Sequence, residues 1–227
     1  MKRFFVGLMS LAVLLAGCGG SSDTGQSLPE GQALLNQSAG AMLDVTSVAF
    51  RLDVEGRLSA FQVKDATGVI SSDAKAKATA QVIQGSRLVE YEYVLADGKI
   101  YLKGATGGFQ EVPATIAARI FNPTALLTGE KSLSQGLAKS RDAKTEAEER
   151  VDGVEAYRVE ATVNSADVEG LTLLASGSSQ GATLWIAKDT SHLVKAVLPF
   201  KVADREETVV TVTFSAFNEN VEITPPI

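Results

Sequence analysis

The sequence predicts an α+β protein in which helices lie on the concave face of a strongly curved antiparallel sheet, a half-barrel. Three observations lead to this fold class: polar and apolar residues alternate along many segments, Asp-Gly pairs separate some of them, and two central stretches have helical spacing. A sheet of so many strands cannot stay flat, because strands twist. With one apolar face, it is expected to curl around the helices.

The composition limits what this fold can do. The 227 residues are 45% hydrophobic and 21% charged, as in ordinary globular proteins, and the formal charge of -6 provides no basic field for a nucleic acid. The single cysteine cannot form an internal disulfide, and one cysteine with one histidine cannot build a Cys/His zinc site. We expect a monomer without a nucleic acid, a metal or a cofactor.

The first residues have the features of an export signal. Lys2 and Arg3 precede a stretch from Phe4 to Ala16 that is apolar except for Gly7 and Ser10. This stretch is too short to span a membrane, whereas its length suits a signal peptide. We therefore expect the protein to be exported from the cytoplasm.

A lipid attachment site follows the apolar stretch. Leu15-Ala16-Gly17-Cys18 resembles the bacterial lipobox, in which small residues precede a cysteine whose thiol accepts a diacylglycerol. The alternative is a buried structural cysteine, but the only cysteine of the chain falls where the motif requires it. The chain is thus predicted to comprise a signal peptide (1–17), the lipidated Cys18 with a flexible tether (18–29), and one domain (30–227). Its acyl chains would hold it on the extracytoplasmic face of the cell membrane.

The domain is predicted to begin with a helix and to continue as strands. Apolar residues between Glu30 and Asp44 recur at helical spacing, and from Val48 to Leu58 they recur at every second position. The second pattern indicates a strand with one face in water. Further strands are expected at residues 67–73, 75–84, 86–96, 99–103, 143–151, 154–163, 182–188, 193–200 and 206–217.

Two hairpin turns and two helices complete the prediction. Asp97-Gly98 and Asp152-Gly153 fit two-residue turns, in which both central residues have positive φ. Consecutive strands are therefore expected to be antiparallel neighbours. Between these turns, Thr115–Phe121 and Thr124–Lys139 have helix-like apolar spacing, and Pro123 fits the first turn of the second helix.

One predicted strand has an inward face of very small side chains. Alternate positions of the 75–84 segment carry Ala76, Ala78, Ala80 and Val82. Either the central helices press closely on this strand, or the missing side-chain volume is a cavity. In the second case the next strand would supply wall residues of matching parity. These residues are Val89, Tyr91 and Tyr93.

Several blocks along the chain resemble those of a known family. They are the lipobox, Asp97–Tyr101, Phe121–Leu127, Val151–Val154, Thr183–Ile186, Thr213–Asn218 and Val221–Pro226. Each block is weak alone. Their order, which covers essentially the whole mature chain, is similar to that of the LppX/LprA-F-G lipoprotein family of mycobacteria and related actinobacteria.

The resemblance implies a non-enzymatic carrier. Members have a curved antiparallel sheet with helices on its concave side around an apolar pocket, in which they bind acylated envelope lipids or lipoglycans for transfer to the outer envelope. A membrane lipid exporter is a candidate partner, and the ligand itself is not specified by the family. The residues expected to line the lipid cavity are Ala76, Ala78, Ala80, Val82, Val89, Tyr91, Tyr93, Ile116, Ile120, Leu126, Leu127, Leu184 and Ile186.

The residues give little support to enzymatic chemistry. His192, the only histidine, follows a turn at a strand start, and no nucleophile elbow or metal signature occurs. The Gly104–Gly108 segment lacks the lysine of a phosphate loop, so it is expected to be a simple connection. Acidic residues within Asp142–Glu149 have the wrong spacing for calcium and are expected on a solvated sheet face.

Two other functions stay open besides the carrier. One is a scaffolding or signalling lipoprotein that binds a protein partner, and the other is a small envelope hydrolase.

Trp185 has the opposite parity to Leu184 and Ile186, so it is expected to cover the outer face of the sheet or its rim.

Overall fold

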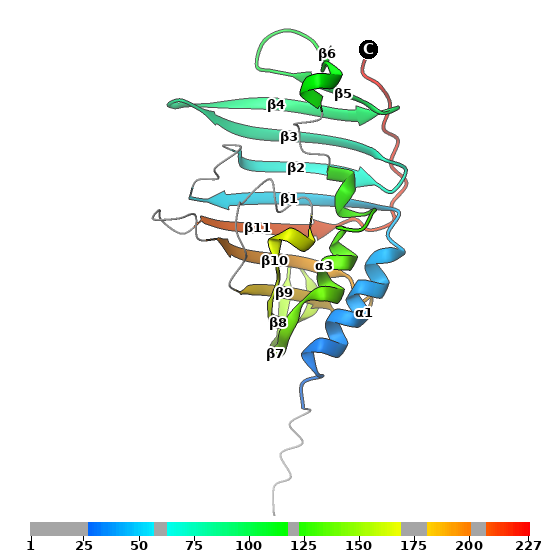
Figure 1. Ribbon diagram of the computed structural model, residues 1–227, viewed down its shortest axis with the longest axis vertical. Coiled ribbons are helices and arrows are strands. Elements are labelled where there is room, and N and C mark those ends of the chain that lie inside the picture. The colour runs from blue at the N-terminus through cyan, green and yellow to red at the C-terminus, as the bar shows by residue number, and fades with distance from the viewer. Residues whose placement is uncertain (1–26, 57–62, 118–122, 169–180, 201–207) are drawn as a thin grey trace, which may run out of the picture.

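The alternating segments of the sequence form eleven strands of one antiparallel sheet, in the order β6-β5-β4-β3-β2-β1-β11-β10-β9-β8-β7 (Figure 1). The computed structural model describes residues 27–56, 63–117, 123–168, 181–200 and 208–227. The strands are β1 (Ser47–Glu55), β2 (Val63–Ser71), β3 (Lys75–Gln84), β4 (Arg87–Ala96), β5 (Lys99–Lys103), β6 (Gln110–Glu111), β7 (Arg141–Val151), β8 (Val154–Thr162), β9 (Ala182–Ala187), β10 (Leu193–Phe200) and β11 (Thr208–Ser215).

Neighbouring strands are consecutive along the chain except at the centre of the sheet. There the first strand, β1, pairs with the last, β11, and all strand pairs are antiparallel. The expectation that consecutive strands are always neighbours fails between β6 and β7, which lie at opposite edges. The sheet is strongly curved, and the helices lie on its concave side (Figure 1). The predicted half-barrel is therefore confirmed. The predicted signal peptide and Cys18 lie outside the described residues, so the division of the chain at 17 and 29 stays a prediction.

Both predicted hairpin turns have the expected backbone. Asp97 and Gly98 have φ of 52° and 73°, and they join β4 to β5. Asp152 and Gly153 have φ of 46° and 90°, and they join β7 to β8. Aspartate and glycine tolerate this left-handed region better than most residues, which explains why these dipeptides stand at the turns.

The opening helix α1 (Gly31–Leu43) is held at its start by Glu30. The Glu30 carboxylate accepts hydrogen bonds from the backbone nitrogens of Gln32 and Ala33, at 2.9 and 2.6 Å. Gly31 then allows the helix to approach β7, because a Cβ at this position would lie 2.7 Å from the backbone of Ala143. Among the described residues, no helix is both long and apolar enough to cross a membrane.

The predicted helix over 124–139 is interrupted. The structure instead has a short 3-10 helix, η1 (Pro123–Leu126), and a second helix, α3 (Leu133–Lys139). Gly129, between them, has a φ of 95°, which ends regular helical geometry, and Ser132 stands as the N-cap of α3 in an extended conformation. Pro123 does begin the first of these helices, as its fixed φ favours.

Other boundaries also differ from the prediction. Of the helix predicted over 115–121, the structure describes only α2 (Ala114–Ala117), and residues 118–122 lie outside the described part. The second strand begins at Val63 rather than at residue 67, because its alternating small residues carry little hydrophobic signal. The shortest remaining element, η2, spans Ser165–Asp167.

The outer, convex face of the sheet carries a long row of mostly polar residues. One row of register partners crosses it from β8 to β5, and nearly all its members are charged residues or threonine. The row consists of Arg158, Trp185, Lys195, Thr213, Arg51, Thr67, Thr79, Glu92 and Lys103. This arrangement matches the predicted strands with one wet face.

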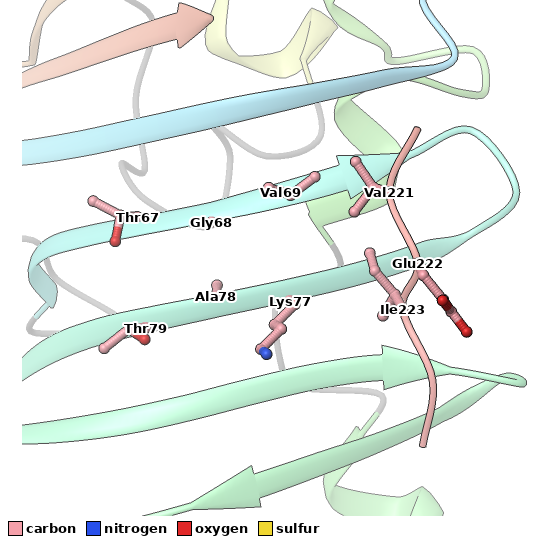
Figure 2. Close-up of a pocket in the computed structure, with 9 residues that line it drawn as sticks. All are labelled: Thr67, Gly68, Val69, Lys77, Ala78, Thr79, Val221, Glu222 and Ile223. Carbon is pink, nitrogen blue, oxygen red and sulfur yellow. The ribbon is translucent and has the colours of Figure 1, made fainter. Parts of the chain in front are cut away.

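The C-terminal segment covers part of this outer face. After β11 the chain crosses β2 and β3, as Figure 2 shows for Val221 to Ile223. Val221 and Ile223 pack with Val94, Ala96 and Tyr101 in an apolar cluster separate from the main core. The apolar outward positions of β4 and β5 are therefore shielded from water by the C-terminal segment.

Candidate functional site

The candidate site is the concave face over β2 and β3, which carries unusually small side chains. The register places Ala78 between Tyr93 on β4 and Gly68 on β2, with Phe50 of β1 next in the same row. The neighbouring row has the same character, with alanines between larger residues. It consists of Tyr91, Ala80, Ala66 and Leu52.

Glycine at position 68 is required by the close approach of β2 and β3. A Cβ there would lie 2.5 Å from the carbonyl oxygen of Lys77 and 2.7 Å from the Cβ of Ala78. Gly68, Ala66 and Phe50 lie on this inner face but were not among the predicted cavity residues. The alternation of β1 already gave Phe50 its inward parity, whereas Ala66 fell before the predicted start of its strand.

Burial changes along this face. Ala76 and Leu95, opposite each other near the β2–β3 turn, are buried, whereas Ala80 and Tyr91, opposite each other nearer the β3–β4 turn, are only half-buried. Val82 and its partner Val89 are half-buried as well. The apolar inner face is therefore closed at one end of β3 and β4 and becomes accessible toward the other end.

Part of the small-residue strip is covered by a helix. η1 comes within 8 Å of both β2 and β3, measured between Cα atoms. Its neighbour Leu127 is buried in the main core, and Leu126 packs against that core. Close packing of a helix therefore accounts for part of the strip. It does not account for Ala78 and Ala80, which remain half-buried.

The structure brings most of the predicted cavity residues to the inner face, but not to one place. Leu184 and Ile186 of β9 are buried in the main core, yet β2, β1, β11 and β10 separate β9 from β3. Ile116 is 52% exposed and lies outside the core, and Ile120 lies outside the described residues. Residues at or packed against the main core are Ala76, Ala78, Ala80, Tyr93, Leu126, Leu127, Leu184 and Ile186.

Two tyrosines on this face differ in their hydrogen bonding. The Tyr91 hydroxyl accepts a hydrogen bond from the side-chain nitrogen of Gln84, at 2.7 Å. The Tyr93 hydroxyl is buried and has no hydrogen-bonding partner among the described residues. Burial also raises the pKa of Tyr93 far above its usual value. This phenol therefore stays neutral and keeps its proton as a donor.

On the outer face, the Glu149 carboxylate accepts hydrogen bonds from Trp185 and Arg158. The indole nitrogen of Trp185 donates a hydrogen bond to one oxygen of Glu149 at 2.8 Å, and Arg158 donates to the other at 2.8 Å. The hydrogen bond from Trp185, together with Arg158, holds the pKa of Glu149 below its usual value. Lys195 lies 4.7 Å from the centre of the Trp185 ring. Trp185 thus covers the outer face, one of its two predicted positions.

The glutamates of β7 are paired with lysines or arginine. Glu146 bonds Lys144 at 2.8 Å, and Glu148 bonds Lys188. In the described part of the chain, no three His, Cys, Asp or Glu side chains gather in a way that could hold a metal ion. The Gly104–Gly108 segment is a connection between β5 and β6, as expected.

His192 contacts an aromatic ring. It stacks on Phe217 with ring centres 4.3 Å apart and lies directly before β10. Burial lowers its pKa, although the nearby Asp189 acts in the opposite direction. Its position agrees with the predicted place after a turn and at a strand start.

A small pocket of about 280 Å³ lies on the outer face of the same two strands, and its lining includes Gly68 and Ala78 (Figure 2). Its wall combines outward residues of β2 and β3, such as Thr67, Lys77 and Thr79, with Val221 and Ile223 of the C-terminal segment. Thr67, Lys77 and Thr79 add hydroxyl and ammonium groups to this wall, whereas the rows around Ala78 and Ala80 on the concave face carry no charged residue.

Comparison with known proteins identifies the family. The model of the LppX_LprAFG lipoproteins matches residues 30–223. The chain belongs to this lipoprotein family. It is 32% identical over 232 residues to the lipoarabinomannan carrier protein LprG of Mycolicibacterium smegmatis, covering 100% of this chain and 96% of the relative. The lipoprotein LprA of Mycobacterium tuberculosis is also 32% identical, over 237 residues that cover 96% of this chain and 94% of LprA.

Solved structures of other family members have the same fold. LprF from Mycobacterium bovis superposes with a TM-score of 0.73 at 20% identity, covering 87% of this chain and 99% of LprF. LppX from Mycobacterium tuberculosis gives a TM-score of 0.60 at 19% identity, covering 85% of this chain and 97% of LppX. The resemblance seen in the sequence is confirmed, and so is the curved antiparallel sheet.

Proposed function

We propose that this lipoprotein binds the acyl chains of envelope lipids on the concave face of its half-barrel and carries them from the membrane toward the outer envelope. The observation that carries the proposal is the apolar strip over β2 and β3, where Ala78 and Ala80 are half-buried although they face the core side of the sheet. The name of the LprG relative supports an acylated lipoglycan as the ligand class.

The chemistry of this face suits acyl chains. Both rows of register partners around Ala78 and Ala80 consist of uncharged residues, so a hydrocarbon chain there displaces no ion pair. A sixteen-carbon chain in water carries an unfavourable hydration free energy on the order of 10 kcal/mol, at about 0.8 kcal/mol per CH₂. An apolar strip that removes the chain from water lowers this barrier. The polar headgroup remains outside it in water.

The proposed anchor is Cys18, acylated after removal of residues 1–17. The folded domain begins with Glu30 and α1, so the 18–29 tether gives it a reach of roughly 15 to 20 Å from the bilayer. Two or three acyl chains hold a protein durably, because each buried CH₂ contributes about 0.8 kcal/mol. In this arrangement the carrier works on the extracytoplasmic face and needs neither a cofactor nor a metal.

The anchor is tested by Cys18→Ala. We expect the variant to keep its fold and to leave the membrane fraction once the signal is removed, since the acyl chains lie outside the domain. The matched control is a chain expressed without residues 1–17, which separates loss of the lipid from retention by an uncleaved signal. A processed variant that stays with membranes after high-salt washing contradicts lipid-only anchoring.

Carriage is tested by native mass spectrometry of the protein released gently from membranes, followed by transfer of a labelled diacyl lipid between two vesicle populations. A carrier emerges with one or more acylated lipids bound and accelerates transfer. A scaffolding or signalling lipoprotein emerges without lipid, does not accelerate transfer and co-purifies with a protein. That second result contradicts the proposal.

A further inference from the structure

The hydroxyl of Tyr93 is a buried polar atom without a hydrogen-bonding partner in the described part of the chain. The side chain is 9% exposed, the oxygen is inaccessible to water, and no described residue forms a hydrogen bond with it. A buried donor that gives up water without gaining a partner destabilises the fold. Such a group in a native protein calls for a specific explanation, of which a bound molecule that satisfies it is one.

The surroundings of Tyr93 show which chemistry could satisfy it. Its register partners are Leu102 on β5 and Ala78 on β3, followed by Gly68 on β2. All are uncharged, so nothing in this row compensates the charge of a phosphate or carboxylate. Ala78 is the direct register partner of Tyr93, and Gly68 follows on the next strand, so the two positions that come next in this row carry little side-chain volume.

Tyr93 also lies at the border between the closed and the accessible part of the face. Leu95, two residues later on β4, is buried, and Tyr91, two residues earlier, is half-buried. The hydroxyl of Tyr91 already has Gln84 as a partner. Of these two tyrosines on the same face, only the deeper one therefore has a buried hydroxyl with no hydrogen-bonding partner among the described residues.

We propose that the Tyr93 hydroxyl donates a hydrogen bond to an ester carbonyl oxygen of the bound acyl lipid. The ester carbonyl oxygen of an acyl lipid is an uncharged hydrogen-bond acceptor. It therefore suits both the uncharged row around Tyr93 and the hydroxyl donor that has no described partner. The inference rests on the proposed function and deepens it, because it makes this carrier selective for ester-linked acyl chains over ether-linked alkyl chains.

The test compares two lipids of equal chain length and headgroup, dipalmitoylphosphatidylglycerol and its dihexadecyl ether analogue. Binding of each is measured with the lipid-stripped full mature protein, its Tyr93→Phe variant and, as a matched control, its Tyr91→Phe variant. We expect wild type to bind the ester about tenfold more tightly, which corresponds to about 1.4 kcal/mol. Tyr93→Phe should bind both lipids equally, and Tyr91→Phe should keep the preference.

The outcomes separate the inference from the function on which it rests. If wild type binds both lipids equally, or if Tyr93→Phe keeps the preference, the inference is wrong while the carrier stands. If wild type binds neither lipid, the proposed function itself fails. A further readout is the melting temperature of the stripped protein, which Tyr93→Phe should leave unchanged or raise, because no bond within the chain is lost. A clear fall overturns the inference.

Discussion

Asn218 accepts two hydrogen bonds from Thr46, a residue 172 positions earlier in the chain. The donors are the backbone nitrogen of Thr46 at 2.8 Å and its hydroxyl at 3.1 Å, and the backbone nitrogen of Asn218 donates in turn to Ser47 at 2.8 Å. These contacts join the start of β1 to the end of β11. They set the point from which the C-terminal segment crosses the outer face.

Asn218→Ala tests this connection. Asn218 has a φ of 60°, which asparagine and glycine tolerate better than alanine does. We expect Asn218→Ala to lower the free energy of unfolding by about 2 kcal/mol, because it combines backbone strain with the loss of the bonds to Thr46. Asn218→Gly loses the same bonds without the strain, so it should cost about 1 kcal/mol. Urea unfolding measures both, and equal losses for the two variants would show that the strain contributes nothing.

Two glycines of α1 test the docking of this helix on the sheet. A Cβ at Gly31 would overlap the backbone of β7, whereas a Cβ at Gly40 meets nothing within 4 Å. We expect Gly31→Ala to destabilise the protein by roughly 1 to 3 kcal/mol through forced displacement. The matched Gly40→Ala should stabilise it by about 0.5 to 1 kcal/mol through helix propensity. A Gly31→Ala variant as stable as wild type would mean that α1 does not approach β7 so closely.

The contact between Trp185 and Glu149 can be followed by fluorescence. Glu149→Ala removes the acceptor of the indole nitrogen and leaves Arg158 without this carboxylate. We expect a lower unfolding midpoint and a red-shifted emission from the only tryptophan of the chain. Glu149→Gln keeps an acceptor oxygen and should retain most of the wild-type emission. Identical spectra for all three proteins would place the tryptophan away from this side chain.

His192 makes stability depend on pH in a defined direction. Burial lowers its pKa in the folded state, so the fold favours the neutral ring stacked on Phe217. The contribution of the neutral His192 ring to the free energy of unfolding is therefore complete above the pKa of histidine in the unfolded chain, about 6.5. This contribution declines as the pH falls below that value. His192→Phe keeps the stacking and cannot ionise. Chemical unfolding between pH 7.5 and 5 should show wild type losing stability relative to this variant, and parallel profiles would contradict the assignment.

The local features of the fold could be predicted from the sequence because short-range physics determines them. The inward parity of Ala78 and Ala80 follows from the alternation of strand side chains, and the positive φ values of Asp97 and Gly98 follow from the demands of a tight hairpin. Trp185 was placed on the correct face by the same parity argument, although the sequence left its partners unknown.

The long-range features could not be predicted in this way. Leu184 has the right parity for the inner face, yet its distance from Ala80 depends on the strand order, which no local pattern encodes. The break at Gly129 depends on a residue that helices also tolerate, and Gly68 gave no hydrophobic signal although β3 requires it. That the Tyr93 hydroxyl finds no partner among the described residues depends on tertiary contacts, which no local pattern encodes.

The most direct test of the central claim is the lipid content of Ala80→Trp. Ala80 lies on the inner face opposite Tyr91, whereas the adjacent Gln81 lies outward opposite Glu90, so Gln81→Trp is a matched control on the same strand. We expect Ala80→Trp to retain severalfold less co-purified lipid than wild type with little change in melting temperature, and Gln81→Trp to retain all of it. If the strip is instead closely packed, the added ring should cost roughly 1 to 3 kcal/mol. A destabilised Ala80→Trp protein with undiminished lipid would contradict binding on the concave face.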